Sequence, residues 1–149
     1  MNSEEIIRLG REAIRTEIEG LEGVVGQLGE PFAEAVGIIA GLKGKVILTG
    51  VGKSGIIARK IASTMVSIGT NAVFMHPVDG LHGDLGTITP GDAAIVLSNS
   101  GTTAEVLNLL APLASLGVPV IAITGNPESP LARQALDHRV QQQTHALGD

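Results

Sequence analysis

From residue 45 onward, short apolar runs alternate with segments of helical length, and this alternation most constrains the fold. Strands separated by helices pair in parallel, with the helices covering both faces of the sheet. We therefore predict an α/β fold with a doubly wound, five-stranded parallel sheet. The expected strands are residues 45–49, 72–75, 93–98, 118–124 and 138–141. The expected helices between them are residues 54–67, 104–116 and 129–136.

Residues 1–44 have a different pattern, with apolar side chains at helical spacing and no strand-like run. We expect helices at 3–20 and at 31–42, where Pro31 suits a first helical position. The sequence thus predicts N-terminal helices at 1–44 that pack on an α/β domain at 45–149. The whole chain is expected to form one structural domain.

Composition excludes several classes of protein. The formal net charge is −5, which argues against non-specific binding to nucleic acid or to an anionic membrane. The absence of cysteine excludes a disulfide framework and a thiolate nucleophile. Charged residues occur throughout the first twenty positions, and no apolar run approaches the roughly 20 residues that span a bilayer. We expect a cytoplasmic protein.

A glycine-rich loop at 49–55 lies between the first expected strand and its helix. Glycine lets the backbone approach an anion, and a helix N-terminus offers free N–H groups, so Gly52, Lys53 and Ser54 are candidate phosphate-binding residues. A P-loop would need glycine where this chain has Ile47. A dinucleotide site would need an acidic residue after the second strand, which ends Phe-Met-His. The remaining alternative is that the glycines of this loop only permit a tight turn that packing requires.

A second loop follows the strand at 93–98 and is rich in hydroxyl groups. Ser98, Asn99, Ser100 and Thr103 would form a cradle for a phosphate dianion at a helix N-terminus. Ordinary helix capping would explain one hydroxyl group, whereas residues 98–103 hold four, at positions 98, 100, 102 and 103. In the strand order 2-1-3-4-5, this loop and the glycine-rich loop flank the crevice at the topological switch point.

A third segment, residues 76–86, is expected to be a long loop with two histidines and two aspartates. Its spacing matches no standard zinc motif, so we predict no metal, and nothing in the chain calls for an organic cofactor. His82 could serve as an acid or base near the crevice, whereas solvated loop residues are the plainer alternative.

Four motifs in this order resemble the sugar isomerase (SIS) domain family, and within it the bacterial D-arabinose-5-phosphate isomerases. They are Gly-Val-Gly-Lys-Ser-Gly at 50–55, His-Gly-Asp-Leu-Gly at 82–86, Ser-Asn-Ser-Gly-x-x-x-Glu at 98–105 and Ile-Thr-Gly-Asn-Pro-Glu-Ser at 123–129. The resemblance implies the flavodoxin-like strand order, a homodimer or homotetramer, and interconversion of D-ribulose 5-phosphate and D-arabinose 5-phosphate. That reaction serves lipopolysaccharide biosynthesis.

The resemblance also implies roles for individual residues. Ser54 and three residues of the second loop match phosphate-binding hydroxyls, namely Ser98, Ser100 and Thr103. Lys53, His82 and Glu105 match residues of the catalytic site. Our mechanistic hypothesis makes Glu105 the base, Lys53 the group that stabilises negative charge, and His82 a proton-transfer group. A first-turn carboxylate that merely stabilises its helix is the alternative for Glu105.

The C-terminal part of the sequence departs from the family pattern. Ala146 stands where the family has a second glutamate, and a later catalytic histidine and a covering helix are not found. The rival hypothesis is therefore a non-catalytic module that binds a sugar phosphate without turning it over. Without that helix, part of one sheet face should be apolar and bare, which favours self-association.

Overall fold

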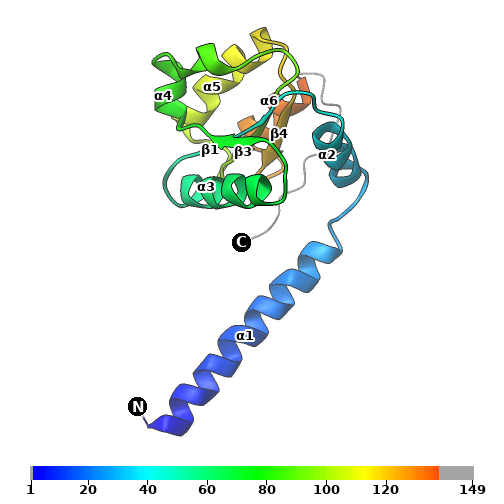
Figure 1. Ribbon diagram of the computed structural model, residues 1–149. Coiled ribbons are helices and arrows are strands. Elements are labelled where there is room, and N and C mark those ends of the chain that lie inside the picture. The colour runs from blue at the N-terminus through cyan, green and yellow to red at the C-terminus, as the bar shows by residue number, and fades with distance from the viewer. Residues whose placement is uncertain (1, 138–149) are drawn as a thin grey trace.

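The protein is described by a computed structural model, which covers residues 2–137. Four parallel strands form one sheet in the order β2-β1-β3-β4 (Figure 1). Their bounds are β1 Val46–Gly50, β2 Ala72–Phe74, β3 Ala93–Leu97 and β4 Val120–Ile123. This confirms the α/β class and the order of the first four strands. The expected fifth strand at 138–141 lies outside the described residues.

Six α-helices and one 3₁₀ helix lie in the described part of the chain. Their bounds are α1 Ser3–Val25, α2 Glu30–Ala40, α3 Gly52–Ser67, α4 Pro77–Leu81, η1 Asp84–Thr87, α5 Ala104–Ser115 and α6 Pro130–Asp137. The expectation of a long loop at 76–86 was wrong, because α4 and η1 occupy most of it. Pro77 starts α4, and the N–H of Val78 donates to His76 Nδ1 over 3.3 Å. Helices of four or five residues are too short for a periodic pattern.

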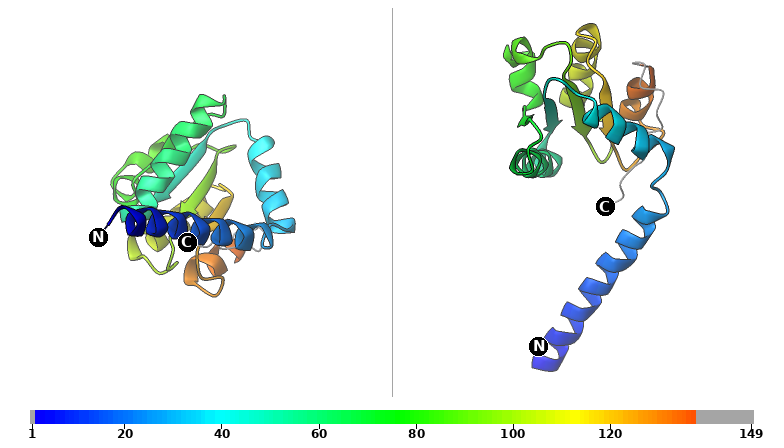
Figure 2. Two further views of the ribbon diagram at one scale, coloured as in Figure 1. Left: turned by 90° about the horizontal axis from the view of Figure 1, so that it is seen from below. Right: turned by 45° about the vertical axis from the view of Figure 1, so that its right-hand side comes forward.

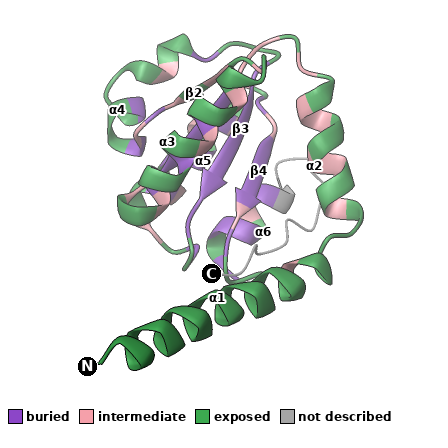
Figure 3. Ribbon diagram, turned by 60° about the horizontal axis from the view of Figure 1, so that its bottom comes forward, coloured by how far each residue is buried: buried purple, intermediate pink, exposed green. Residues whose placement is uncertain are grey.

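Alternation along the strands divides the core between the two faces of the sheet. Ile47 points toward α5 and α6, whereas Val46 and Leu48 point toward α2 and α3. The helices that follow β1 and β3 thus cover opposite faces, as the doubly wound prediction requires. The core is aliphatic, and β1, β3 and β4 are its most buried part (Figure 3), whereas the edge strand β2 has no buried residue.

The two N-terminal helices differ in their contacts with the domain. Ala35, Ile38 and Ile39 of α2 pack against the sheet. By contrast, α1 has no buried residue and extends away from the rest of the molecule (Figures 1 and 2). The packing of α1 on the α/β domain stays a prediction. In residues 2–137, no helix combines the length and the apolar character needed to cross a membrane.

A nearly buried ion pair joins two segments at the amino ends of β1 and β3. Asp92 accepts hydrogen bonds from Lys45 Nζ at 2.6 Å, from the Lys45 N–H at 2.8 Å and from the Thr89 N–H at 2.8 Å. Burial raises the pKa of Asp92, but these hydrogen bonds and the charge of Lys45 outweigh burial and hold the pKa below its ordinary value of 3.8.

We expect Asp92→Ala to lower the free energy of unfolding by about 3 kcal/mol at pH 7, because Lys45 and the backbone N–H groups lose their acceptor. Because the folded pKa is lowered, the contribution of Asp92 is fully present above about pH 4 and is lost as pH falls through the folded value. Urea unfolding at pH 7 and pH 3 measures both effects. Glu128→Ala, which removes a solvent-exposed ion pair with Arg133, is the matched control and should change little. If Asp92→Ala lowered the free energy of unfolding as much at pH 3 as at pH 7, that result would contradict this account.

Candidate phosphate-binding cleft

The glycine-rich loop is shaped partly by packing. A Cβ atom on Gly55 would lie 2.6 Å from the carbonyl oxygen of Gly50, and one on Gly50 would lie 2.9 Å from that of Leu97. These two glycines let α3 sit close to β1 and β3. Gly52 has open space around it but a φ of +60°, which glycine adopts readily. Packing alone therefore accounts for Gly50 and Gly55, while Gly52 forms the turn into α3.

The N-terminus of α3 carries unneutralised positive potential. Val51 is the N-cap residue and makes no side-chain capping bond. The first intrahelical bond is donated by the Gly55 N–H to the Val51 oxygen over 3.3 Å, so the N–H groups of Gly52, Lys53 and Ser54 have no partner inside the helix. Lys53 adds a cation to this first turn, which holds no acidic residue. A cation is unfavourable at a helix N-terminus, so the arrangement is suited to an anion.

Hydroxyl groups of the second loop are bonded to one another rather than used as caps. Ser98 Oγ and Thr103 Oγ1 lie 3.1 Å apart, and Ser98 Oγ also accepts from the Gly101 N–H at 3.2 Å. Thr103 is the N-cap residue of α5, yet its side chain makes no capping bond to the helix. Ser100 Oγ accepts from Thr102 Oγ1 at 3.0 Å. Simple N-capping therefore does not explain the cluster, and α5 presents a second helix N-terminus without a side-chain cap.

Gly101 holds this loop against the loop after β4. Its φ is +64°, and a Cβ atom there would overlap the Ser129 side chain and lie 2.9 Å from Thr124 Oγ1. The carbonyl of Gly101 also accepts from the Leu131 N–H at 3.1 Å. The second loop is thus fixed by close backbone approach rather than by side-chain packing alone.

Gly101→Ala should lower the free energy of unfolding by at least about 2 kcal/mol, because it adds both backbone strain and a steric overlap. Gly10→Ala is the control, since Gly10 lies in exposed helix with nothing within 4 Å, and this change should be neutral or stabilising. Chemical denaturation of both variants measures the difference. Equal free energies of unfolding for the two variants would show that the loop accommodates the added methyl group, and would contradict this prediction.

The two loops line one cleft at the carboxyl ends of β1, β3 and β4, with a volume of about 490 Å³. Lys53 and Ser54 contribute from α3, and Ser98 and Asn99 from the loop after β3. Thr103 lies next to the cleft through its contact with Ser98. The predicted juxtaposition of the loops across the switch point is confirmed.

Part of the cleft was missed by sequence reasoning. Thr124 and Gly125 line it together with Ile57, Ile61, Leu97 and Ile123. The Gly125 N–H donates to the Asn99 oxygen at 2.9 Å and Thr124 Oγ1 donates to the same oxygen at 3.2 Å, which ties this loop to the second one. The signal was present in the strand order, since the carboxyl end of β4 must lie beside that of β3.

The other predicted site residues lie outside this cleft. Ser100 is exposed and turned toward Thr102. Glu105 is exposed in the first turn of α5, and His82 is exposed immediately after α4. Among residues 2–137, no hydrogen bond or ion pair joins either side chain to the cleft. Nor does this part of the chain bring three or more His, Cys, Asp or Glu side chains together in a way that could hold a metal ion.

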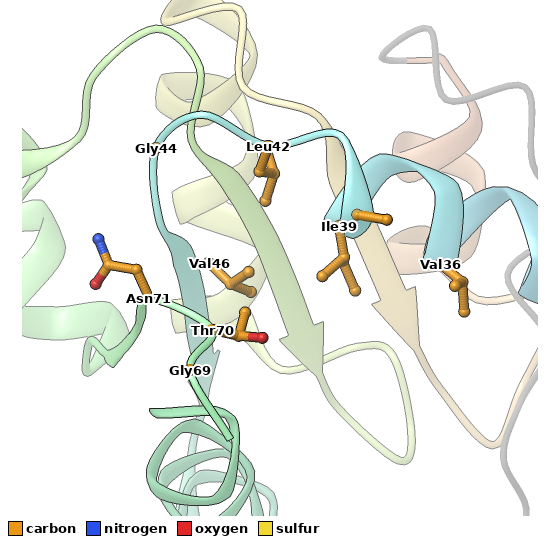
Figure 4. A pocket seen from close by; sticks show the side chains of 9 residues that line it. Val36, Ile39, Leu42, Gly44, Val46, Gly69, Thr70 and Asn71 are labelled. Atoms are coloured by element: carbon orange, nitrogen blue, oxygen red, sulfur yellow. The ribbon is translucent and has the colours of Figure 1, made fainter. Parts of the chain in front are cut away.

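A second cleft, of about 520 Å³, lies near the amino ends of β1 and β2 (Figure 4). Its lining includes Val36, Ile39 and Leu42 on one side and Thr70 and Asn71 on the other. Within the described residues, its lining holds no charged side chain, and it is remote from both helix N-termini described above. We therefore place the candidate site at the carboxyl ends of the strands.

Fold and site together define a doubly wound α/β protein with a cleft at its switch point. The model of the SIS domain family matches residues 39–147. The chain belongs to the SIS domain family.

Known proteins agree with this assignment. The chain is 41% identical over 146 residues to the arabinose 5-phosphate isomerase KdsD of Pseudomonas aeruginosa, covering 96% of this chain and 45% of the relative. It is 47% identical over 127 residues to KdsD of Francisella tularensis, covering 83% of this chain and 39% of the relative. The chain thus spans less than half the length of these two curated relatives.

Among solved structures, the chain resembles c3406 of Escherichia coli CFT073, which was determined in complex with arabinose 5-phosphate. The TM-score is 0.83 at 40% sequence identity, with 90% of this chain and 71% of that chain covered. The two chains are therefore similar in sequence as well as in fold.

Proposed function

We propose that the cleft between the two loops binds the phosphoryl group of a phosphorylated sugar. The observation that supports this most directly is a cleft lined by Lys53 and Ser54, at the N-terminus of α3 that has no side-chain cap, and by Ser98 across from them. The Ser98 hydroxyl lies 3.1 Å from that of Thr103, the N-cap residue of α5. Free N–H groups, hydroxyls and one cation suit a phosphate dianion. The structural relative that holds arabinose 5-phosphate supports the same class of ligand.

The reaction we propose is the interconversion of D-arabinose 5-phosphate and D-ribulose 5-phosphate, in keeping with the isomerase activity named for the curated relatives. A base removes the proton from C2 of the open-chain aldose, and electrons move onto the C1 carbonyl oxygen. In the resulting enediolate the C2 hydroxyl proton moves to O1, and the proton taken by the base is delivered to C1, which gives the ketose with atoms and charge balanced. In the cell this activity would serve lipopolysaccharide synthesis in the cytoplasm.

Glu105 is the proposed base, since it lies in the first turn of α5, directly after the loop proposed to bind phosphate. Lys53 would stabilise the enediolate oxygen from the opposite side of the cleft, and His82 would move protons between the sugar oxygens. Phosphate held by Ser54, Ser98 and Thr103 would supply binding energy that positions C1 and C2. Ser100 would have to turn from Thr102 to join them. Glu105 and His82 lie outside the cleft, so substrate that extends from it would have to reach them.

A non-catalytic phosphosugar-binding module is the second candidate. The specific observation in its favour is Ala146, which takes the place of the family's second glutamate. In that case phosphate binding would survive without proton transfer.

The purified chain tests both proposals when it is mixed with D-arabinose 5-phosphate. Calorimetry measures binding, and NMR in D₂O follows both ketose formation and deuterium exchange at the carbon next to the carbonyl. We expect saturable binding with turnover. Binding without ketose or exchange would favour the module, and the absence of binding would overturn the function proposed for the cleft.

A further inference from the structure

The side chain of Asn99 lines the cleft without a hydrogen-bond partner. The backbone of this residue is fixed, because its carbonyl oxygen accepts from the Gly125 N–H at 2.9 Å and from Thr124 Oγ1 at 3.2 Å. Within residues 2–137, no donor or acceptor pairs with its side-chain amide, which is exposed at the cleft. An amide carries two N–H donors and one carbonyl acceptor, so Asn99 keeps this whole capacity for a bound molecule.

Gly125 makes room for this amide. A Cβ atom on Gly125 would overlap the side-chain oxygen of Asn99, and would lie 3.2 Å from its backbone oxygen and 3.3 Å from its Cγ. The backbone conformation does not require glycine here, because the φ of Gly125 lies outside the left-handed region that Gly101 occupies. The space that glycine leaves at position 125 is therefore filled chiefly by the Asn99 side chain.

The contact with Gly125 turns the Asn99 amide away from the proposed phosphate position. The sheet order places β3 between β1 and β4 (Figure 3). Asn99 follows β3 and Gly125 follows β4, whereas Ser54 and the N-terminus of α3 follow β1. The amide therefore lies on the β4 side of the cleft, while the phosphoryl group is proposed to lie between the loops after β1 and β3.

The β4 side of the cleft suits a hydroxyl group better than a phosphate. Thr124 Oγ1 already donates to the Asn99 oxygen and accepts from the Asn126 N–H at 3.3 Å, and Ile123 is apolar. Among the described residues on this side, the Asn99 amide is thus the polar side chain left to a ligand. A hydroxyl group both donates and accepts, as an amide does, whereas the oxygens of a phosphate dianion only accept.

We propose that Asn99 is a specificity-determining residue whose amide binds a hydroxyl group on C3 or C4 of the sugar, and that Gly125 is the positioning residue that keeps this amide in the cleft. This role rests on the function proposed for the cleft. C3 and C4 lie between the phosphoryl group and the reacting carbons, so their hydroxyl groups distinguish one sugar from another without taking part in the proton transfer. A site that hydrogen-bonds a substrate hydroxyl disfavours an analogue that lacks it.

Calorimetry of the wild type and of full-length Asn99→Ala tests the role of Asn99. The ligands are D-arabinose 5-phosphate, its 3-deoxy and 4-deoxy analogues, and inorganic phosphate. We expect the wild type to bind one of the two deoxy analogues about five- to tenfold more weakly than the parent sugar, which corresponds to one net hydrogen bond. Asn99→Ala should bind the parent sugar more weakly by the same factor, should not distinguish it from that analogue, and should bind inorganic phosphate as the wild type does.

Asn71→Ala is the matched control, since Asn71 is an exposed asparagine beside the other cleft. Its affinities should equal those of the wild type. If the wild type bound both deoxy analogues as tightly as the parent sugar, or if Asn99→Ala kept the discrimination, the role of Asn99 would be overturned while the phosphate site stood. Loss of inorganic phosphate binding in Asn99→Ala would make Asn99 a phosphate ligand and overturn this role as well. A wild type that bound neither phosphate nor sugar would overturn the function proposed for the cleft and this role with it.

Gly125→Ala tests the positioning role separately. The added methyl group should displace the Asn99 amide, so we expect Gly125→Ala to weaken binding of D-arabinose 5-phosphate as much as Asn99→Ala does and to leave inorganic phosphate binding unchanged. The double variant should bind no more weakly than either single variant, because both changes remove the same contact. Additive losses, or a loss of inorganic phosphate binding in Gly125→Ala, would show a general structural role and overturn the positioning role.

Discussion

Ser54→Asp is expected to weaken binding of D-arabinose 5-phosphate by about 100-fold or more. The new carboxylate would lie in the first turn of α3, beside the free N–H groups and Lys53 that we propose to face the phosphoryl group. It would satisfy those N–H groups itself and repel the dianion at close range. Calorimetric titration at constant ionic strength measures the loss, since the electrostatic part of binding depends on salt.

Ser67→Asp provides the matched control. Ser67 is exposed at the opposite end of the same helix, where its hydroxyl donates to the Thr64 oxygen at 2.7 Å. This change adds the same charge to α3 but far from the cleft, so affinity should stay within about twofold of the wild type. Comparable losses in both variants would mean that net charge, and not the cleft, controls binding.

Glu105→Gln is expected to lower kcat by roughly 10²–10⁴-fold while leaving the dissociation constant for substrate nearly unchanged. The amide keeps the shape of the side chain but cannot accept the C2 proton, and general-base catalysis contributes an effect of this size. Because Glu105 is exposed and forms no ion pair in the described structure, losing its first-turn charge should lower the free energy of unfolding by no more than about 1 kcal/mol. NMR of ketose formation gives the rate, and deuterium exchange isolates proton abstraction from later steps.

Glu128→Gln is the corresponding control, since Glu128 is an exposed glutamate whose ion pair with Arg133 spans 3.4 Å. Its turnover should match the wild type. Intact turnover in Glu105→Gln would exclude Glu105 as the base and return it to the role of a first-turn carboxylate that stabilises α5.

The fold was largely predictable because local and global patterns agree. The buried runs at β1 and β3, each with its helix, predicted parallel pairing and opposite helical faces correctly. The helical character of α1 was predictable from its amphipathic spacing. Periodicity does not say which surface an apolar stripe will contact, so the packing of α1 on the domain stays a prediction. The short helices α4 and η1 escaped prediction because they depend on Pro77 and on local turns rather than on periodicity.

The cleft was predictable only in part. Ser54 and Ser98 follow neighbouring strands, so the switch-point rule placed them together correctly. Thr124 and Gly125 were not predicted as site residues because the loop after β4 holds fewer glycine and hydroxyl groups than the other two loops. The rule says nothing about side-chain reach, so it could not decide that Glu105 and His82 would lie outside the cleft. Their catalytic roles rest on resemblance and stay predictions.

A crystal structure of this chain with D-arabinose 5-phosphate tests the central claim most directly. The account predicts a phosphoryl group within hydrogen-bonding distance of Ser54 and of the loop from Ser98 to Thr103, with the sugar directed toward Glu105. A phosphoryl group bound elsewhere, such as in the cleft beside Thr70 and Asn71, would contradict it.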